Sequence, residues 1–181
     1  MIILLALAGL STSSVMIATS SGTLPIRVAF TKNTPRMVSE VASYYMLFRH
    51  VRSVKEFADE TVQKGEDVSF LRSYFTYMAG LDRQQSQTLE TIAIETLAQV
   101  AEQDARAQTI IDEYDRQFPG GKIPSNIKMP PPPPQLKILQ QEKDAMLLKG
   151  RDRLQMALGK DGFDKLTTYI AREINPKITI K

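Results

Sequence analysis

The chain of 181 residues contains no cysteine and no tryptophan, and it has a single histidine, His50. Without cysteine it can form neither a disulfide scaffold nor a zinc site with thiolate ligands. With one histidine, a Ser-His-Asp arrangement has only one possible base. The sequence also lacks the glycine-rich motifs that hold phosphates in nucleotide-binding enzymes. These absences predict a protein that is not an enzyme and has no cofactor.

His50 itself is a weak candidate for chemistry. It stands between Arg49 and Val51 in a segment rich in aromatic residues, where a packed or surface histidine is the usual case. Met46, four residues earlier, shares a helical face with His50, and the two side chains together suit a soft metal such as copper(I). Two ligands make a poor site, so we predict neither a catalytic residue nor a metal centre.

Charge is nearly balanced over the whole chain but is divided between two regions. The net charge of +3 is too small to indicate nucleic-acid binding. The basic group Lys149, Arg151 and Arg153 is also a weak sign of it, because no aromatic residue that could stack on bases lies among the three. Residues 82–116 carry three basic and eight acidic side chains, whereas residues 135–181 carry ten basic and six acidic ones. Opposite charge favours packing of these two regions against each other.

The first 20 residues carry no charged side chain and resemble an export signal. An apolar run at residues 2–10 is followed by small residues, with Ala18 and Ser20 in the spacing of a cleavage site. The segment lacks a basic start, however, and the polar residues 11–14 interrupt the run. Three interpretations therefore stay open: a cleaved signal peptide, which we favour, a retained short membrane anchor, and a buried core helix. Contact with a membrane is expected only if the segment is retained.

Hydrophobic spacing of three and four residues predicts about five helices and an all-α fold. After a linker at residues 21–36, we expect a single helical domain at 37–174, with a proline-rich connection at 119–134 and a tail at 175–181. The helices are expected to begin and end near the following residues: Thr34–Pro35 to Lys64–Gly65, 67–79, 82–118, 135–158 and 161–174.

The expected central helix is unusually long and has a clear start. Asp82 and Gln85 are placed for a reciprocal capping box, with Leu81 as the hydrophobic staple. More than 30 residues make a rod of roughly 50 Å, so part of it is expected to project or to pair with another chain, as in a homodimer. Its apolar stripe weakens at Gln103 and Asp104.

Five consecutive prolines, residues 130–134, separate the central helix from the next one. They are expected to form a polyproline II strut of roughly 15 Å. We interpret the strut as a spacer that sets where the next helix begins, and a docking site for a proline-binding partner is the alternative. The architecture is then an extended helical hairpin or bundle. Gly150, inside the helix that follows, indicates a kink or a close contact.

Seven aromatic residues of the first two expected helices form a candidate protein-binding surface. One interpretation is an exposed aromatic groove for apolar ligands or unfolded chains, and the other is core packing against Tyr45 and Phe48. The seven residues are Tyr44, Tyr45, Phe48, Phe70, Tyr74, Phe75 and Tyr77.

Two leucine-led helix starts share a layout. Residues 81–85 are followed by Leu89, and residues 158–162 by Leu166. The first copy resembles the motif of Spy/CpxP-like periplasmic helical proteins, in which leucine, threonine and two variable residues precede glutamine, although Asp82 stands in the threonine position. The second copy matches only at its leucine. The layout is also similar to small uncharacterised exported bacterial helical proteins. The resemblance implies a periplasmic, ATP-independent chaperone or stress-binding role as a dimer of curved helices.

We therefore predict a non-catalytic, exported helical protein that binds other proteins and is chaperone-like or stress-related. The alternative is a structural accessory subunit of a membrane-associated complex, anchored by an uncleaved segment at residues 1–20.

N-terminal sequencing of the mature protein separates these two hypotheses. Export with cleavage predicts a mature chain that begins near Ser21 and is found in the periplasm. An intact Met1 in membrane fractions contradicts free release and supports the anchored subunit.

Overall fold

The computed structural model describes residues 38–117 and 131–178, all within one unit that spans Arg36–Lys181. The described residues form five α-helices and no strand, which confirms the all-α prediction. The expected signal segment or anchor (1–20), the linker (21–36) and most of the proline-rich connection lie outside the described residues. None of the described helices is long and apolar enough to span a lipid bilayer.

The helices differ from the predicted ones in how they divide the chain. The region expected to form one helix at 67–79 forms two. The two helices expected after the prolines are both present, on either side of the non-helical residue Gly159, and together carry the label α5. A π-helical turn, Ile170–Ile174, and a 3-10 turn, Asn175–Lys177, follow the last helix. The five helices are α1 (Glu40–Gln63), α2 (Ser69–Arg72), α3 (Tyr74–Ala79), α4 (Arg83–Asp115) and α5 (Pro134–Tyr169).

The predicted start of α4 is confirmed by its hydrogen bonds. The Asp82 carboxylate accepts from the Gln85 backbone N–H at 2.7 Å, and the Asp82 N–H donates to the Gln85 side chain at 3.0 Å. Leu81, the expected staple, is buried. These contacts satisfy amide groups that the first helical turn leaves free. The helix ends at Asp115, three residues before the expected end at Phe118.

The expected start of α1 at Thr34–Pro35 is wrong for this helix. α1 begins at Glu40, because Ser39 has an extended backbone and its hydroxyl accepts from the Ala42 N–H at 3.2 Å. Serine is among the best N-cap residues. The predicted C-terminal stop is correct, since the helix ends at Gln63, two residues before Gly65.

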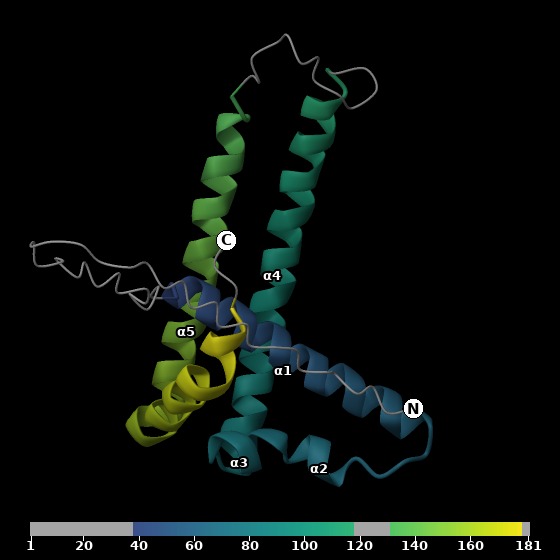
Figure 1. Cartoon of the computed structure of the whole chain (residues 1–181), viewed down its shortest axis with the longest axis vertical. Helices are drawn as coiled ribbons and strands as arrows, with labels where there is room; N and C mark the ends of the chain where they lie inside the picture. The colour runs from purple at the N-terminus through teal and green to yellow at the C-terminus, as the bar shows by residue number, and fades with distance from the viewer. Residues whose placement is uncertain (1–37, 118–130, 179–181) are drawn as a thin grey trace, which may run out of the picture. The chain divides into compact units, whose positions relative to one another are not determined.

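The kink in α5 lies at Gly159, where the sequence predicts the end of a helix. Its φ of 65° and ψ of 178° are not helical, and glycine adopts a positive φ without the steric cost of a side chain. The helix resumes directly after Gly159, so the chain turns without a loop. In Figure 1 the ribbon changes direction here, and the following yellow segment returns toward α1.

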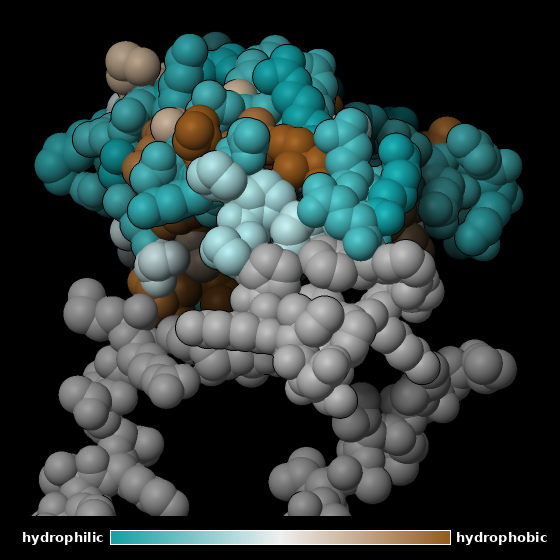
Figure 2. Space-filling model, turned by 90° about the horizontal axis from the view of Figure 1, so that it is seen from above, coloured by the Kyte–Doolittle hydropathy of each residue, from teal (hydrophilic) through white to brown (hydrophobic). Residues whose placement is uncertain are grey.

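The core lies where α1 crosses the long pair α4 and α5 (Figure 1). Phe48 of α1, Leu89 of α4 and Leu154 of α5 are completely buried in one hydrophobic cluster. Seen from above, polar side chains cover most of the described surface, and hydrophobic side chains show in small patches between them (Figure 2).

The opposite charges of the two long helices meet as ion pairs. Lys143 of α5 contacts Asp104 of α4 at 2.8 Å, and Arg153 contacts Glu95 at 2.6 Å. These pairs are partly exposed, so each contributes at most about 1 kcal/mol. Contacts with α5 also explain why the apolar stripe of α4 weakens at Gln103 and Asp104. Asp104 pairs with Lys143, and the buried side-chain amide of Gln103 donates to the Glu142 carboxylate.

Gly150→Ala tests how closely the three helices approach. A Cβ at this position would lie 2.8 Å from the Thr96 hydroxyl and 3.0 Å from the Phe48 ring, and both neighbours are buried. Alanine favours a helix by about 1 kcal/mol, but overpacking costs roughly 1–3 kcal/mol. We expect a net loss of stability in urea unfolding.

Ala145→Gly, at an exposed position of the same helix, is the matched control and should cost about 1 kcal/mol. If Gly150→Ala stabilises the protein by the amount that this control loses, the close contact does not limit packing.

Candidate functional site

The segment α2–α3 carries two exposed aromatic residues that lie next to each other. Phe70 is 56% exposed and Tyr77 is 70% exposed. Their rings stack, with centroids 6.0 Å apart and an interplanar angle of 15°. Tyr74 contacts Phe70 edge-on at 6.0 Å and is partly exposed. We call Phe70, Tyr74 and Tyr77 the aromatic surface.

The structure divides the seven predicted surface residues into two groups. Tyr44, Phe48 and Phe75 are buried members of the hydrophobic core, so for these three the core-packing interpretation is correct and the exposed groove is wrong. Tyr44 and Phe48 are buried because their face of α1 packs on α4 and α5. Phe75, on α3, is buried against the rings of His50 and Tyr169.

Tyr45, the remaining predicted residue on α1, has its ring covered by other side chains. It is partly buried, and its ring is covered by two cations: Lys143 Nζ lies 4.9 Å and the Arg49 guanidinium carbon 5.7 Å from the ring centroid. Such contacts are favourable because the face of an aromatic ring is electron-rich. Of the seven predicted residues, only Phe70, Tyr77 and the exposed part of Tyr74 therefore offer an aromatic face to a partner. Phe57 of α1, which is not among the seven, is also 56% exposed.

His50 lies behind the aromatic surface, in contact with three other rings. Its ring centroid is 5.5 Å from that of Tyr74, 6.0 Å from Phe75 and 6.4 Å from Tyr169. Its Nε2 atom is buried and has no hydrogen-bond partner within the described part of the chain. His50 thus joins α1 to α3 and to the end of α5 as a packing residue.

Burial also sets the protonation of this cluster. It lowers the pKa of His50, Lys177 lowers it further, and Glu173 opposes the shift. Burial raises the pKa of the neighbouring Tyr169 phenol, which Tyr74 also raises by a hydrogen bond. The histidine is therefore neutral and the phenol protonated near neutral pH. Among residues 38–117 and 131–178, no three His, Cys, Asp or Glu side chains gather as a metal site.

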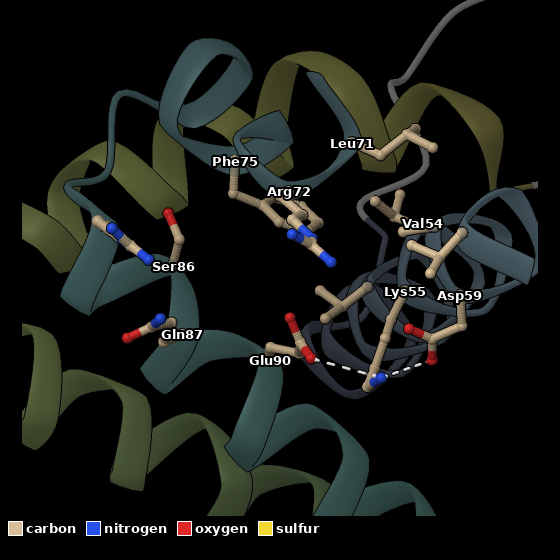
Figure 3. A pocket seen from close by; sticks show the side chains of 13 residues that line it. Val54, Lys55, Asp59, Leu71, Arg72, Phe75, Ser86, Gln87 and Glu90 are labelled. Atoms are coloured by element: carbon tan, nitrogen blue, oxygen red, sulfur yellow. Dashed lines mark hydrogen bonds and ion pairs between the residues drawn. The ribbon is translucent and has the colours of Figure 1, made fainter. Parts of the chain in front are cut away.

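A cavity of about 230 Å³ lies between α1, α2–α3 and the start of α4 (Figure 3). Its wall is mixed: apolar side chains such as Val51, Val54 and Phe75 line it together with five charged ones. Lys55 of α1 forms ion pairs with Asp59 at 2.6 Å and with Glu90 of α4 at 4.0 Å. A hollow that combines apolar and charged side chains suits binding of a ligand.

The sequence contains no local signal for this cavity. Its lining comes from residues between 51 and 90 on four separate helices, and each residue type is ordinary for an amphipathic helix. Only the crossing of α1 over α4, together with the turn of α2–α3, brings them together.

No protein-family model, curated protein or solved structure matches this chain. What the aromatic surface and the cavity do is therefore inferred from their own geometry.

His50→Phe should make stability less sensitive to mild acid. Below a pH of about 6.5 the unfolded chain protonates His50, whereas the folded chain resists because burial lowers the pKa. The wild type should therefore lose stability as the pH falls below about 6.5, until the folded chain also binds the proton. The slope is below about 1.4 kcal/mol per pH unit, because one proton is involved and the ring is partly exposed. Phenylalanine keeps the ring packing and removes the proton.

Urea unfolding at a series of pH values measures this slope. The two proteins should become parallel once the pH is low enough for the folded chain also to protonate His50. Equal slopes for the wild type and His50→Phe between these limits contradict the assignment of a buried neutral histidine.

Proposed function

We propose that this protein binds apolar segments of other polypeptides through the aromatic surface and has no catalytic role. The observation that carries the proposal is the exposed, stacked pair Phe70 and Tyr77. Large aromatic side chains are costly to leave in water and are typical anchors of protein interfaces. An isolated exposed apolar residue is common, but adjacent stacked rings form a patch.

The energy available at this surface is sufficient for reversible binding. Complete burial of a large apolar side chain contributes roughly 1.5–3 kcal/mol. Phe70 and Tyr77 already contact each other, so a partner gains the remaining exposed area of both rings. Their fixed stacking also means that little side-chain freedom is lost on binding.

The helices that carry the surface are suited to adapt to different partners. α2 has only four residues and none of them is buried, and α3 has six. Between them, Ser73 leaves the helical conformation with φ −104° and ψ 10°. Segments with few buried contacts open at low free-energy cost, so α2 can shift without disturbing the core.

A chaperone-like role outside the cytoplasm is part of this proposal. The apolar segment at residues 1–20 supports export. The leucine-led start at Leu81–Gln85 supports a likeness to the Spy/CpxP-like proteins in function as well as in motif.

Replacing both exposed rings, as Phe70→Ala with Tyr77→Ala, tests the proposal. The wild type should suppress the aggregation of a chemically denatured client protein, measured by light scattering, at a few-fold molar excess. The double variant should lose most of this effect, because two anchors of roughly 1 kcal/mol or more each are removed. Its stability should change little, since both rings are mostly exposed.

Ile138→Ala is the matched control. Ile138 is 55% exposed near the start of α5, away from α2–α3 (Figure 1), and its loss should leave suppression unchanged. A wild type without effect at several-fold excess, or a double variant as active as the control, contradicts the proposed function.

A further inference from the structure

We propose that the cavity between α1, α2–α3 and α4 is a separate site that binds a small apolar molecule carrying one carboxylate group. The site is distinct from the aromatic surface, because neither Phe70 nor Tyr77 lines it. Its ligand class follows from three features: the apolar part of its wall, two arginines that have no side-chain partner among the described residues, and a limited volume.

The wall is made by side chains that already belong to or adjoin the core. Val51, Ala58 and Phe75 are buried and line the cavity. Val54 and Leu71 line the cavity and are partly exposed, and Val62 is 46% exposed. An apolar ligand body placed against these three removes apolar surface from water on both sides, which is the main driving force for binding in such pockets. The volume of about 230 Å³ has room for roughly eight water-sized groups, which fits a short hydrocarbon chain or one aromatic ring.

Two arginines at the cavity are available for an anion. Arg72 points into the hollow in Figure 3, and Arg83 also lines it. Within the described residues, neither guanidinium forms an ion pair, and neither takes part in a side-chain hydrogen bond. A guanidinium binds a carboxylate through two parallel hydrogen bonds, which fixes the orientation of the ligand.

The acidic residues at the cavity limit the charge of the ligand. Lys55 is held by Asp59 and Glu90, so the lining as a whole has three basic and two acidic side chains. The resulting excess of one positive charge suits a monoanion and disfavours a dianion such as a phosphate monoester.

The contact between Lys55 and Glu90 also limits the size of the ligand. It joins α1 to α4 beside the cavity, as the dashed line in Figure 3 shows. An extended peptide needs a groove that is open along its length, whereas a short molecule fits a cavity bounded in this way. The occupant is therefore a small molecule rather than a polypeptide.

Isothermal titration calorimetry of the full chain with sodium octanoate tests this site. Octanoate should bind with a dissociation constant below about 1 mM, and more weakly as salt is added, because salt screens the arginines. The neutral 1-octanol and the cationic octylammonium, which share the chain but lack the carboxylate, should bind at least about threefold more weakly.

Variants locate the binding. Arg72→Gln should weaken octanoate binding about threefold to fivefold, as expected for a partly exposed charge pair. Arg106→Gln, on α4 outside the cavity lining, removes the same charge and should leave binding unchanged. Val54→Phe should abolish binding by filling the cavity. If Val54→Phe does not fold, the two arginine variants still decide the result.

Three outcomes overturn the proposal: no heat from octanoate at millimolar concentration, equal binding of octanoate and 1-octanol, or equal effects of Arg72→Gln and Arg106→Gln. The variant that lacks Phe70 and Tyr77 should bind octanoate like the wild type. The octanoate titration therefore tests the cavity alone, and the aggregation assay tests the aromatic surface alone.

Discussion

The close approach of α1, α4 and α5 at Gly150 is the constraint on which the rest of the structure depends. A larger side chain at this position would collide with Thr96 of α4 and Phe48 of α1. The three helices therefore meet at a point where only the hydrogen atom of a glycine side chain fits. Phe48, Leu89 and Leu154 complete the core around it. Because interiors are close-packed, this contact fixes how α1 crosses the long pair, and the crossing in turn places every other element.

The two candidate sites follow from that crossing. α1 extends past α4, and the chain returns along it as the short helices α2 and α3, too small to cover the space between the longer ones. One side of α2–α3 closes the cavity with Phe75, whose ring is buried. The other side leaves Phe70 and Tyr77 in solvent. His50 stabilises this arrangement by packing on rings from α3 and from the end of α5.

Much of the fold was predictable because its signals are local. The α4 capping box involves Asp82 and Gln85 only, and the bend at Gly159 needs only a residue that tolerates a positive φ. The opposite charges of the two long helices were visible in composition, and they meet as pairs such as Lys143 with Asp104. The α1 start was misplaced because Thr34 and Ser39 are both good caps, and local sequence does not rank them.

The sequence alone determined that the chain is all-helical, where α4 begins and where α5 bends, because hydrogen bonds and backbone preferences within a few residues decide these features. Only the tertiary structure decided which aromatic rings are buried and that residues from four helices enclose a cavity. A helical stripe of aromatic residues has the same spacing whether it faces a core or a partner. The rotation of each helix against its neighbours makes that choice, and it buried Phe48 and Phe75 while leaving Phe70 and Tyr77 exposed.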